Sequence, residues 1–559
     1  MKTVCINCRN PYEITESDMD FYDKISPVID GKKYPLPAPT KCPSCRVQRR
    51  MAWRNERTLY NRKCDLCKKS IISIFTPEAK HPVYCPTCFV SDKWDATHYG
   101  RNFDFSRPFF EQYSELQKVV PMTALHHERE NENCEYTNLT SDNKNCYLVF
   151  AAGNNEFAFY TTYLQRCRDI ADCFFIFDSE LCYECIDCYH GYNLLYSHNC
   201  QNCSDSQLLF DCKSCKHCFG CVNLTNKEFY IFNQPYTKEE YANKIKELTN
   251  SRESFAEARK EVEKIKLALP HKYYSGHNNE NFSGDHIFSS KNAFNCFDCN
   301  NLEDCSYCTW MTKSKDCQDC YAWGNTGELG YENHLCGNGY HNVKFCDGCS
   351  NDISNLMYSE CIRNSSHDIF GCISLFRKEY CILNKPYAKE DYFKLLAQIM
   401  EHMQRNGEWG QPFPISLSRF AYNETIAQEY APLSKEAVIS LGGRWKEEEL
   451  KTHYQGKSTA IPYDINEVSD DILKEILSCK TCGKNYRLIA QELNLYRKLK
   501  VSVPENCFAC RYKNRFNQRN PRKLYERICH SCQIEIQTTY DPQRPETILC
   551  ETCYLKETH

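Results

Sequence analysis

The sequence lacks long apolar runs and the short motifs of common enzyme families. No run of about 18 apolar residues occurs, so we expect no membrane-spanning helix. The segment from Met1 to Cys5 is not the start of an apolar signal segment, which favours a reducing, cytoplasmic environment. The patterns G-x-x-x-x-G-K-[ST], G-x-S-x-G and H-E-x-x-H are all missing. These absences make an enzyme the least favoured class.

Cysteine is the residue in large excess, with 41 among 559 residues. Eight C-x-x-C pairs lie near the two ends, and each pair can place two thiolates on one edge of a zinc tetrahedron. We therefore predict four structural zinc ions per chain, with interleaved pairing and iron–sulfur clusters as alternatives. The predicted ligand sets are Cys5, Cys8, Cys42 and Cys45; Cys64, Cys67, Cys85 and Cys88; Cys479, Cys482, Cys507 and Cys510; and Cys529, Cys532, Cys550 and Cys553.

The two ends of the chain are copies of each other. Adding 465 to the number of Cys42 gives Cys507, and the same offset relates the arginines that follow. These arginines recur at helical spacing beside aromatic residues, a combination that suits phosphate and exposed bases. The predicted nucleic-acid contacts are Arg46, Arg49, Arg50, Trp53, Arg54, Arg57, Arg62, Arg511, Arg515, Arg519, Arg522 and Arg527.

Charge is segregated along the chain, although the net charge is only −4. The range 41–69 holds ten Lys/Arg against two acidic residues, whereas the range 128–221 holds fourteen Asp/Glu against six Lys/Arg. Basic ends on an acidic body favour binding to a polyanion. Such charge runs are also typical of solvated or ion-paired helices.

A triplet rule governs the cysteines between the two ends. In the first cysteine-rich block every spacing is a multiple of three, and Asn or Asp often precedes the cysteine. A coil of short sides and tight corners explains this period, with small residues inside and Asn or Asp at left-handed corners. We therefore predict a β-solenoid.

The length of one coil of this solenoid stays open at this point. A spacing of 12, as from Cys188 to Cys200, and a spacing of 18, as from Cys167 to Cys185, both recur. A second block follows the same phase until about Trp323, where a bulge or an inserted loop is expected.

These inner thiols favour a packing role, because cysteine behaves as a small apolar residue. A thiolate ladder for soft metal ions and redox disulfides are the alternatives.

The predicted fold is mainly β with helices: two cysteine-rich β-solenoid blocks between double zinc-ribbon modules. The ends of the blocks correspond at an offset of 151, which indicates an internal repeat. Helices are expected from a capping box at Thr237 and Glu240 to about Leu269, and from Lys389 to Arg405. The predicted segments are an N-terminal double zinc ribbon (1–90), a connector (91–130), the first block (131–235), a helical linker (236–279), the second block (280–386), a helical and mixed linker (387–478) and a C-terminal double zinc ribbon (479–559).

Two segments carry a family resemblance. The range 14–50, with Cys42-Pro-Ser-Cys45-Arg46, resembles the bacterial "probable zinc-ribbon" domain, and the range 486–511, with Cys507-Phe-Ala-Cys510-Arg511, is similar. The whole arrangement resembles uncharacterised cysteine-rich zinc-ribbon proteins of candidate-phylum bacteria. The resemblance supports the metal ligands and implies no activity.

Three functions are compatible with these patterns. The favoured one is a non-enzymatic, zinc-stabilised scaffold that binds nucleic acid or a ribonucleoprotein through its arginines. A metal-storage or thiol-buffer protein would instead use the inner cysteines. A protein-interaction scaffold would use the faces of the solenoid.

Overall fold

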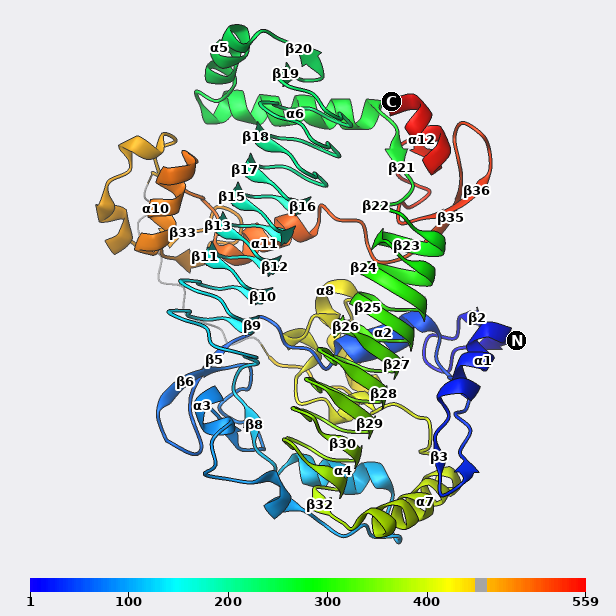
Figure 1. Ribbon diagram of the computed structural model, residues 1–559. Helices are drawn as coiled ribbons and strands as arrows, with labels where there is room; N and C mark the ends of the chain where they lie inside the picture. Colours follow the sequence, from blue (N-terminus) through cyan, green and yellow to red (C-terminus); the bar gives the residue numbers. More distant parts are fainter. Residues whose placement is uncertain (448–459, 559) are drawn as a thin grey trace. The chain divides into compact units, whose positions relative to one another are not determined.

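The protein is a mixed α/β chain with more strand than helix, as the computed structural model in Figure 1 shows for residues 1–447 and 460–558. It forms two compact units, each discontinuous in sequence. The first unit combines Met1–Leu125, Tyr274–Glu447 and Arg522–Leu524, and the second combines His126–Tyr273, Glu448–Pro521 and Tyr525–His559. Each unit thus joins one cysteine-rich block to cysteine pairs from the far end of the sequence. Residues 448–459 of the predicted linker lie outside the described residues.

Short parallel strands build the first block, which belongs to the second unit. They form two five-stranded sheets between which successive strands largely alternate. The first sheet contains β9 (Asn138–Ser141), β10 (Phe150–Gly153), β12 (Thr162–Gln165), β14 (Phe174–Phe177) and β16 (Ile186–Tyr189). The second contains β11 (Glu156–Phe159), β13 (Arg168–Ala171), β15 (Glu180–Tyr183), β17 (Tyr192–Leu195) and β18 (Ser204–Gln207). Phe150 aligns with Thr162 and Glu156 with Arg168, so the pairing interval is 12 and not 18.

Left-handed backbone recurs at every third residue of this block and explains the triplet rule. Asn145, Asp172 and Asn199 have φ of 53°, 54° and 55°, as expected for residues at corners. Bulky residues adopt the same conformation, including Tyr160 and Phe175, with φ of 57° and 56°. The sequence did not predict these, because only Asn, Asp and Gly commonly tolerate a positive φ.

Apolar side chains fill the interior of the block: the predicted cysteines and alanines, together with larger residues such as Leu164, Ile170 and Leu194. All cysteines of the two blocks are buried except the half-buried Cys134, and every cysteine of the described chain is free of disulfides. The inner thiols donate hydrogen bonds to backbone carbonyls, as Cys185 Sγ does to the oxygens of Tyr183 at 3.5 Å and Leu194 at 3.1 Å. Their polar atoms are therefore satisfied without a metal ion.

The second block, in the first unit, is one parallel sheet for most of its length. Its strands are β22 (Gly276–His277), β23 (Glu280–Phe288), β24 (Lys291–Ser306), β25 (Thr309–Gln318), β26 (Tyr321–Asn325), β27 (Gly327–Tyr331), β28 (Tyr340–Lys344), β29 (Ile353–Met357), β30 (His367–Phe370), β31 (Glu379–Ile382) and β32 (Lys385–Pro386). The interval is 12 where Cys305 aligns with Cys317, and 13 where Lys315 aligns with Glu328. Successive positive φ values at Ala322 and Trp323 accommodate the extra residue, at the predicted irregularity.

Helices cover the end of each block. In the second unit, α5 (Lys238–Leu248) begins at the predicted Thr237 capping box, and α6 (Arg252–Ala268) lies across the end of the block (Figure 1). Ala258 and Val262 of α6 belong to one buried cluster with Phe219. The single helix predicted here is therefore broken near Ser251, which caps α6. The remaining helices and turns of this unit are α10 (Ala490–Leu499), α11 (Phe508–Phe516), α12 (Glu551–Thr558), η4 (Ile465–Glu467) and η5 (Asp470–Lys474).

In the first unit, α7 (Lys389–Arg405) matches its predicted bounds and buries Leu396, Ile399 and Met403. The other helices and turns here are α1 (Glu16–Ile25), α2 (Pro43–Met51), α3 (Pro86–Phe89), η1 (Ala96–Tyr99), α4 (Phe109–Gln117), η2 (Ile415–Leu417), η3 (Tyr422–Glu424), α8 (Ala427–Tyr430) and α9 (Lys435–Ser440). Among the described residues, no helix is both long enough and apolar enough to cross a membrane.

A substitution at an exposed corner tests the left-handed backbone. Asn226 has φ of 56° and is exposed, so Asn226→Val should destabilise the protein by about 1–2 kcal/mol, because a β-branched residue is strained there. Asn226→Gly is the matched control and should change stability by less than about 1 kcal/mol. Denaturant midpoints measure both, and equal midpoints would contradict a left-handed corner.

Candidate metal centres

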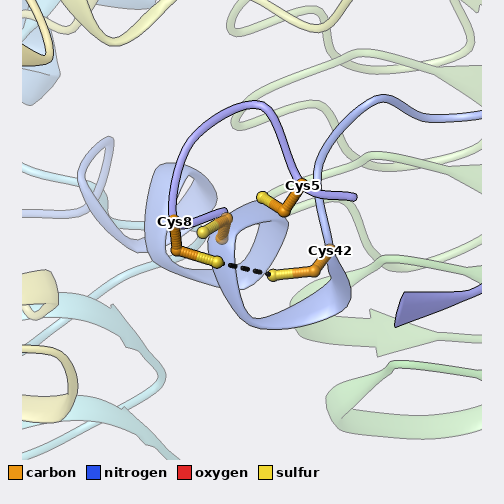
Figure 2. Close-up of side chains that lie close together, drawn as sticks. Cys5, Cys8 and Cys42 are labelled. Carbon is orange, nitrogen blue, oxygen red and sulfur yellow. Dashed lines mark hydrogen bonds between the residues drawn. The ribbon is translucent and has the colours of Figure 1, made fainter. Parts of the chain in front are cut away.

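Four groups of cysteines bring their sulfur atoms together, and they are the four predicted sets. Within each group all four sulfurs lie within 4.8 Å of one another. The Cys8–Cys42 and Cys482–Cys507 sulfurs are both 3.7 Å apart, and Figure 2 shows the side chains of Cys5, Cys8 and Cys42 converging. A tetrahedron with metal–sulfur bonds of about 2.3 Å has edges of about 3.8 Å. These four tetrads could therefore each hold one metal ion.

The first C-x-x-C pair of every tetrad lies in the turn of a two-stranded antiparallel hairpin. The hairpins are β1 (Lys2–Val4) with β2 (Pro11–Glu13), β5 (Tyr60–Lys63) with β6 (Ser70–Ser73), β33 (Leu477–Ser478) with β34 (Asn485–Tyr486), and β35 (Tyr525–Ile528) with β36 (Glu535–Thr538). The residue after each pair has left-handed backbone: Arg9, Lys68, Gly483 and Gln533, with φ of 61–70°. The four turns thus share one conformation, although only one of them contains glycine.

The second C-x-x-C pair of every tetrad lies at the start of a helix. Cys42 is the residue before α2, Cys85 before α3, Cys507 before α11, and Cys550 before α12. The thiols at these helix starts have raised pKa values: the neighbouring Cys45 thiol raises the pKa of Cys42, and burial raises the pKa of Cys550 to about 12. A metal ion bound to a tetrad would hold one hairpin against one helix.

Backbone N–H groups prepare one thiol of each tetrad for metal binding. Burial raises the pKa of Cys5, but hydrogen bonds from backbone N–H groups, that of Cys42 foremost, lower it to about 6. The same causes bring the pKa of Cys64 to about 7, and those of Cys479 and Cys529 to about 6. At neutral pH a thiol with a pKa of about 6 is largely ionised and Cys64 is about half ionised, and the thiolate is the form that binds a metal ion.

In the first unit the arginines of α2 are buried against the second block. Arg46 Nε lies 2.9 Å from Asp319, and Arg50 Nη2 and Nη1 lie 2.8 Å from Asp319 and Glu332. Arg49 also pairs with Glu332. Although burial disfavours the charge of Arg46, the Asp319 carboxylate holds the pKa of this arginine above its usual value. The most exposed of these five side chains is that of Arg49, at 9%.

In the second unit α11 makes corresponding contacts with the first block. Arg511 Nη1 lies 2.6 Å from Asp172, and Arg515 Nη1 lies 2.9 Å from the other oxygen of the same carboxylate. Arg519 Nε lies 2.8 Å from Asp187. Asp172 and Asp187 are fully buried, so these pairs lie inside the unit.

The remaining predicted contact residues are also occupied within their own units. Trp53 is buried with its ring centre 5.4 Å from that of Phe413, and Arg57 pairs with Glu429. The other partners are Glu56 for Arg54, Asp65 for Arg62, Asp298 for Arg522, and the carbonyls of Asp541 and Glu546 for Arg527. Most of the expected basic face is thus buried and ion-paired, whereas others of these residues, such as Arg57, Arg62 and Arg527, are half-buried; ion pairing is the alternative interpretation of the charge run. Nucleic-acid binding itself stays a prediction, and these positions do not support it.

The acidic partners of the arginines were not identified from the sequence. Asp172, Asp187 and Asp319 each lie at a left-handed corner, directly before an inward cysteine. Two signals pointed to them: the acidic character of the body and the frequent Asp before cysteine. Neither signal connects the aspartates to the arginines, because the partners are 269–339 residues apart in sequence.

Comparisons with known proteins add no relative. No protein-family model matches the chain, and no curated protein sequence matches it. The assignment of these centres therefore depends on the geometry of the cysteines and arginines alone.

Removing one buried arginine tests whether these residues hold the unit together. Arg50→Ala leaves Asp319 and Glu332 with less compensation inside the protein, and it should destabilise the first unit by about 3–5 kcal/mol. Lys63→Ala, at an exposed position on β5, is the control and should cost less than about 0.5 kcal/mol. Denaturant unfolding measures both changes, and a similar small effect of both would contradict a structural role.

Proposed function

We propose that the protein is a non-enzymatic scaffold stabilised by four zinc ions. In it, α2 and α11, which we call the arginine helices, are held against the second and the first β-solenoid block. The geometry of the tetrads carries this proposal. Four thiolates complete a tetrahedral shell and leave no position for water or substrate, which is typical of structural and not of catalytic zinc. The sulfur separations suit a single ion in each site, and zinc is the usual ion for four cysteines at this spacing.

The β-solenoid part of the proposal rests on strand pairing and backbone conformation. Each strand pairs in parallel with the strand 12 residues further along the chain, so one coil of the chain contains 12 residues. Four left-handed corners in each interval give four short sides with one inward residue each. The interior takes one apolar or small side chain from each side, most often Cys but also Ala158, Leu164 and Ile170, so packing explains the cysteines without a second metal-binding function.

Metal storage is less well supported than a structural role. Outside the four tetrads, no group of three or more Cys, His, Asp or Glu side chains within residues 1–447 and 460–558 has the geometry to hold a metal ion. The inner thiols of the first block, among them Cys188 and Cys212, donate hydrogen bonds to carbonyls instead.

Metal analysis tests the structural role directly. The protein should contain about four zinc ions per chain, one for each tetrad. Cys8→Ser should lower the content to about three, whereas Cys134→Ser, outside the tetrads, should leave it at about four. Many more than four ions would favour metal storage.

Metal binding should also weaken in acid. Hydrogen bonds from backbone N–H groups keep the pKa of Cys5 at about 6 despite its burial, so its thiolate is available between about pH 6 and the ordinary thiol pKa of 9.0, and protonation competes with the metal ion as the pH falls through about 6. Zinc release followed by a chromogenic chelator measures this dependence. Retention of all the zinc well below pH 5 would contradict the role of the Cys5 thiolate.

Nucleic acid is the partner that the segregated charge suggests, and a test must avoid the buried arginines, whose removal would unfold the units. Lys63, Lys68 and Lys69 are exposed beside the second N-terminal tetrad. Reversing all three to Glu should weaken binding of a mixed-sequence single-stranded RNA and make its salt dependence shallower by about two units. A matched triple reversal at Lys244, Lys260 and Lys264 of α5 and α6 should have little effect. Equal binding by both variants would exclude this surface as the contact.

A further inference from the structure

The two units hold their arginine helices with residues that correspond in position. Arg46 and Arg511 are related by the offset of 465, and each guanidinium lies over a tyrosine ring, at 5.2 Å and 4.6 Å from its centre. Here the block residues correspond at an offset of 147, which becomes 148 after the extra residue at Ala322–Trp323. The tyrosines under the arginines are Tyr307 and Tyr160, and the aspartates that pair with the arginines are Asp319 and Asp172. The tyrosines that face α1 and α10 are Tyr331 and Tyr183. Each block therefore presents the same receptor for an arginine helix.

One carboxylate does not follow this correspondence: it comes from the block in the second unit and from the arginine-bearing segment in the first. In the second unit Arg519 pairs with Asp187, which belongs to the block. In the first unit the corresponding Arg54 pairs with Glu56, which belongs to the same segment as the arginine. Position 521, which corresponds to Glu56, is a proline.

The block position that corresponds to Asp187 is Leu335. Both residues have left-handed backbone, with φ of 53° and 52°, and each directly precedes an inward, buried cysteine. The residue before each one pairs with an aromatic residue of the preceding strand, Phe174 or Tyr321. The Phe174 and Tyr321 rings lie 5.8 Å and 5.7 Å from the guanidinium groups of Arg519 and Arg54, and the Phe175 and Trp310 rings lie nearer to them, at 4.3 Å and 5.3 Å.

We infer that the position of this carboxylate determines which arginine helix each block accepts. If the N-terminal module, which carries α2, Arg54 and Glu56, docked on the first block, Glu56 would lie beside Asp187. Two carboxylates would then share Arg54 in a buried site. A C-terminal module on the second block would place Arg519 against Leu335 without either carboxylate. Both exchanged pairings are penalised, by like-charge repulsion and by a buried charge with less compensation. The specificity acts within one chain and between copies, and it does not depend on the metal or on a nucleic-acid partner.

Transferring the carboxylate within the second unit tests this inference in the full-length protein. Asp187→Leu should raise hydrogen-exchange rates in α11 by about tenfold or more, because Arg519 loses the carboxylate of the block. Adding Pro521→Glu should restore protection to within about threefold of the wild type, because the carboxylate then comes from the module as in the first unit. Helix α2 of the first unit provides an internal reference that should not change in either variant.

A neutral variant separates charge from shape. Pro521→Gln should not rescue Asp187→Leu, because glutamine has the size of glutamate without its charge. Rescue by glutamine as well as by glutamate, or no effect of Asp187→Leu, would overturn the inference. Independent, additive effects of Asp187→Leu and Pro521→Glu would also overturn it.

The reciprocal exchange keeps the test decisive if Asp187→Leu fails to fold. Leu335→Asp adds a second carboxylate near Arg54 and Glu56, and it should raise exchange in α2 by about tenfold. Adding Glu56→Gln should remove the repulsion and restore protection, with α11 now as the reference. If the Glu56→Gln change worsens the effect of Leu335→Asp, the two carboxylates do not compete for one site.

Discussion

A buried arginine is stable only where carboxylates compensate its charge. The arginines here belong to helices that begin at the cysteine tetrads, and the carboxylates belong to the cysteine-rich blocks, so these ion pairs connect the two parts of each unit. Arg50 is about 1% exposed and contacts both Asp319 and Glu332, which are equally buried. Loss of one member would leave a charge without its partner at a cost of several kcal/mol, so the helix and the block depend on each other. The same relation holds between Arg511 and Asp172 in the second unit.

The tetrads act on this interface although they do not form it. A hairpin of two short strands is marginally stable by itself in water, and a helix as short as α2 is also marginal. A metal ion bound by four thiolates would hold both elements in one geometry and supply folding free energy. The arginines, which begin one residue after Cys45 and after Cys510, would then reach the block from a helix that is already formed.

The sequence predicted those features that depend on near neighbours. The tetrads follow from C-x-x-C pairs, and the corners at Asn145 and Asp172 follow from residues that tolerate a positive φ. The interval of 12 did not follow, because cysteines spaced by multiples of three fit 18 as well. The burial of the arginines did not follow either, because helical spacing of Arg describes an exposed basic face and an ion-paired one equally well. Only the position of Asp319, 269 residues away from Arg50, distinguishes them.

These separations also suggest an order for folding. Contacts within the blocks join positions 12 or 13 apart, and the tetrads join C-x-x-C pairs whose cysteines are 18–40 apart, whereas the arginine pairs with the blocks join residues hundreds of positions apart. Closing a longer loop costs more entropy and takes longer, so blocks and tetrads should form before the helices dock. At that stage two similar receptors and two similar helices are present in one chain. A chain built from copies therefore needs a difference between them to pair correctly, and a carboxylate on the block in one unit and on the module in the other provides it.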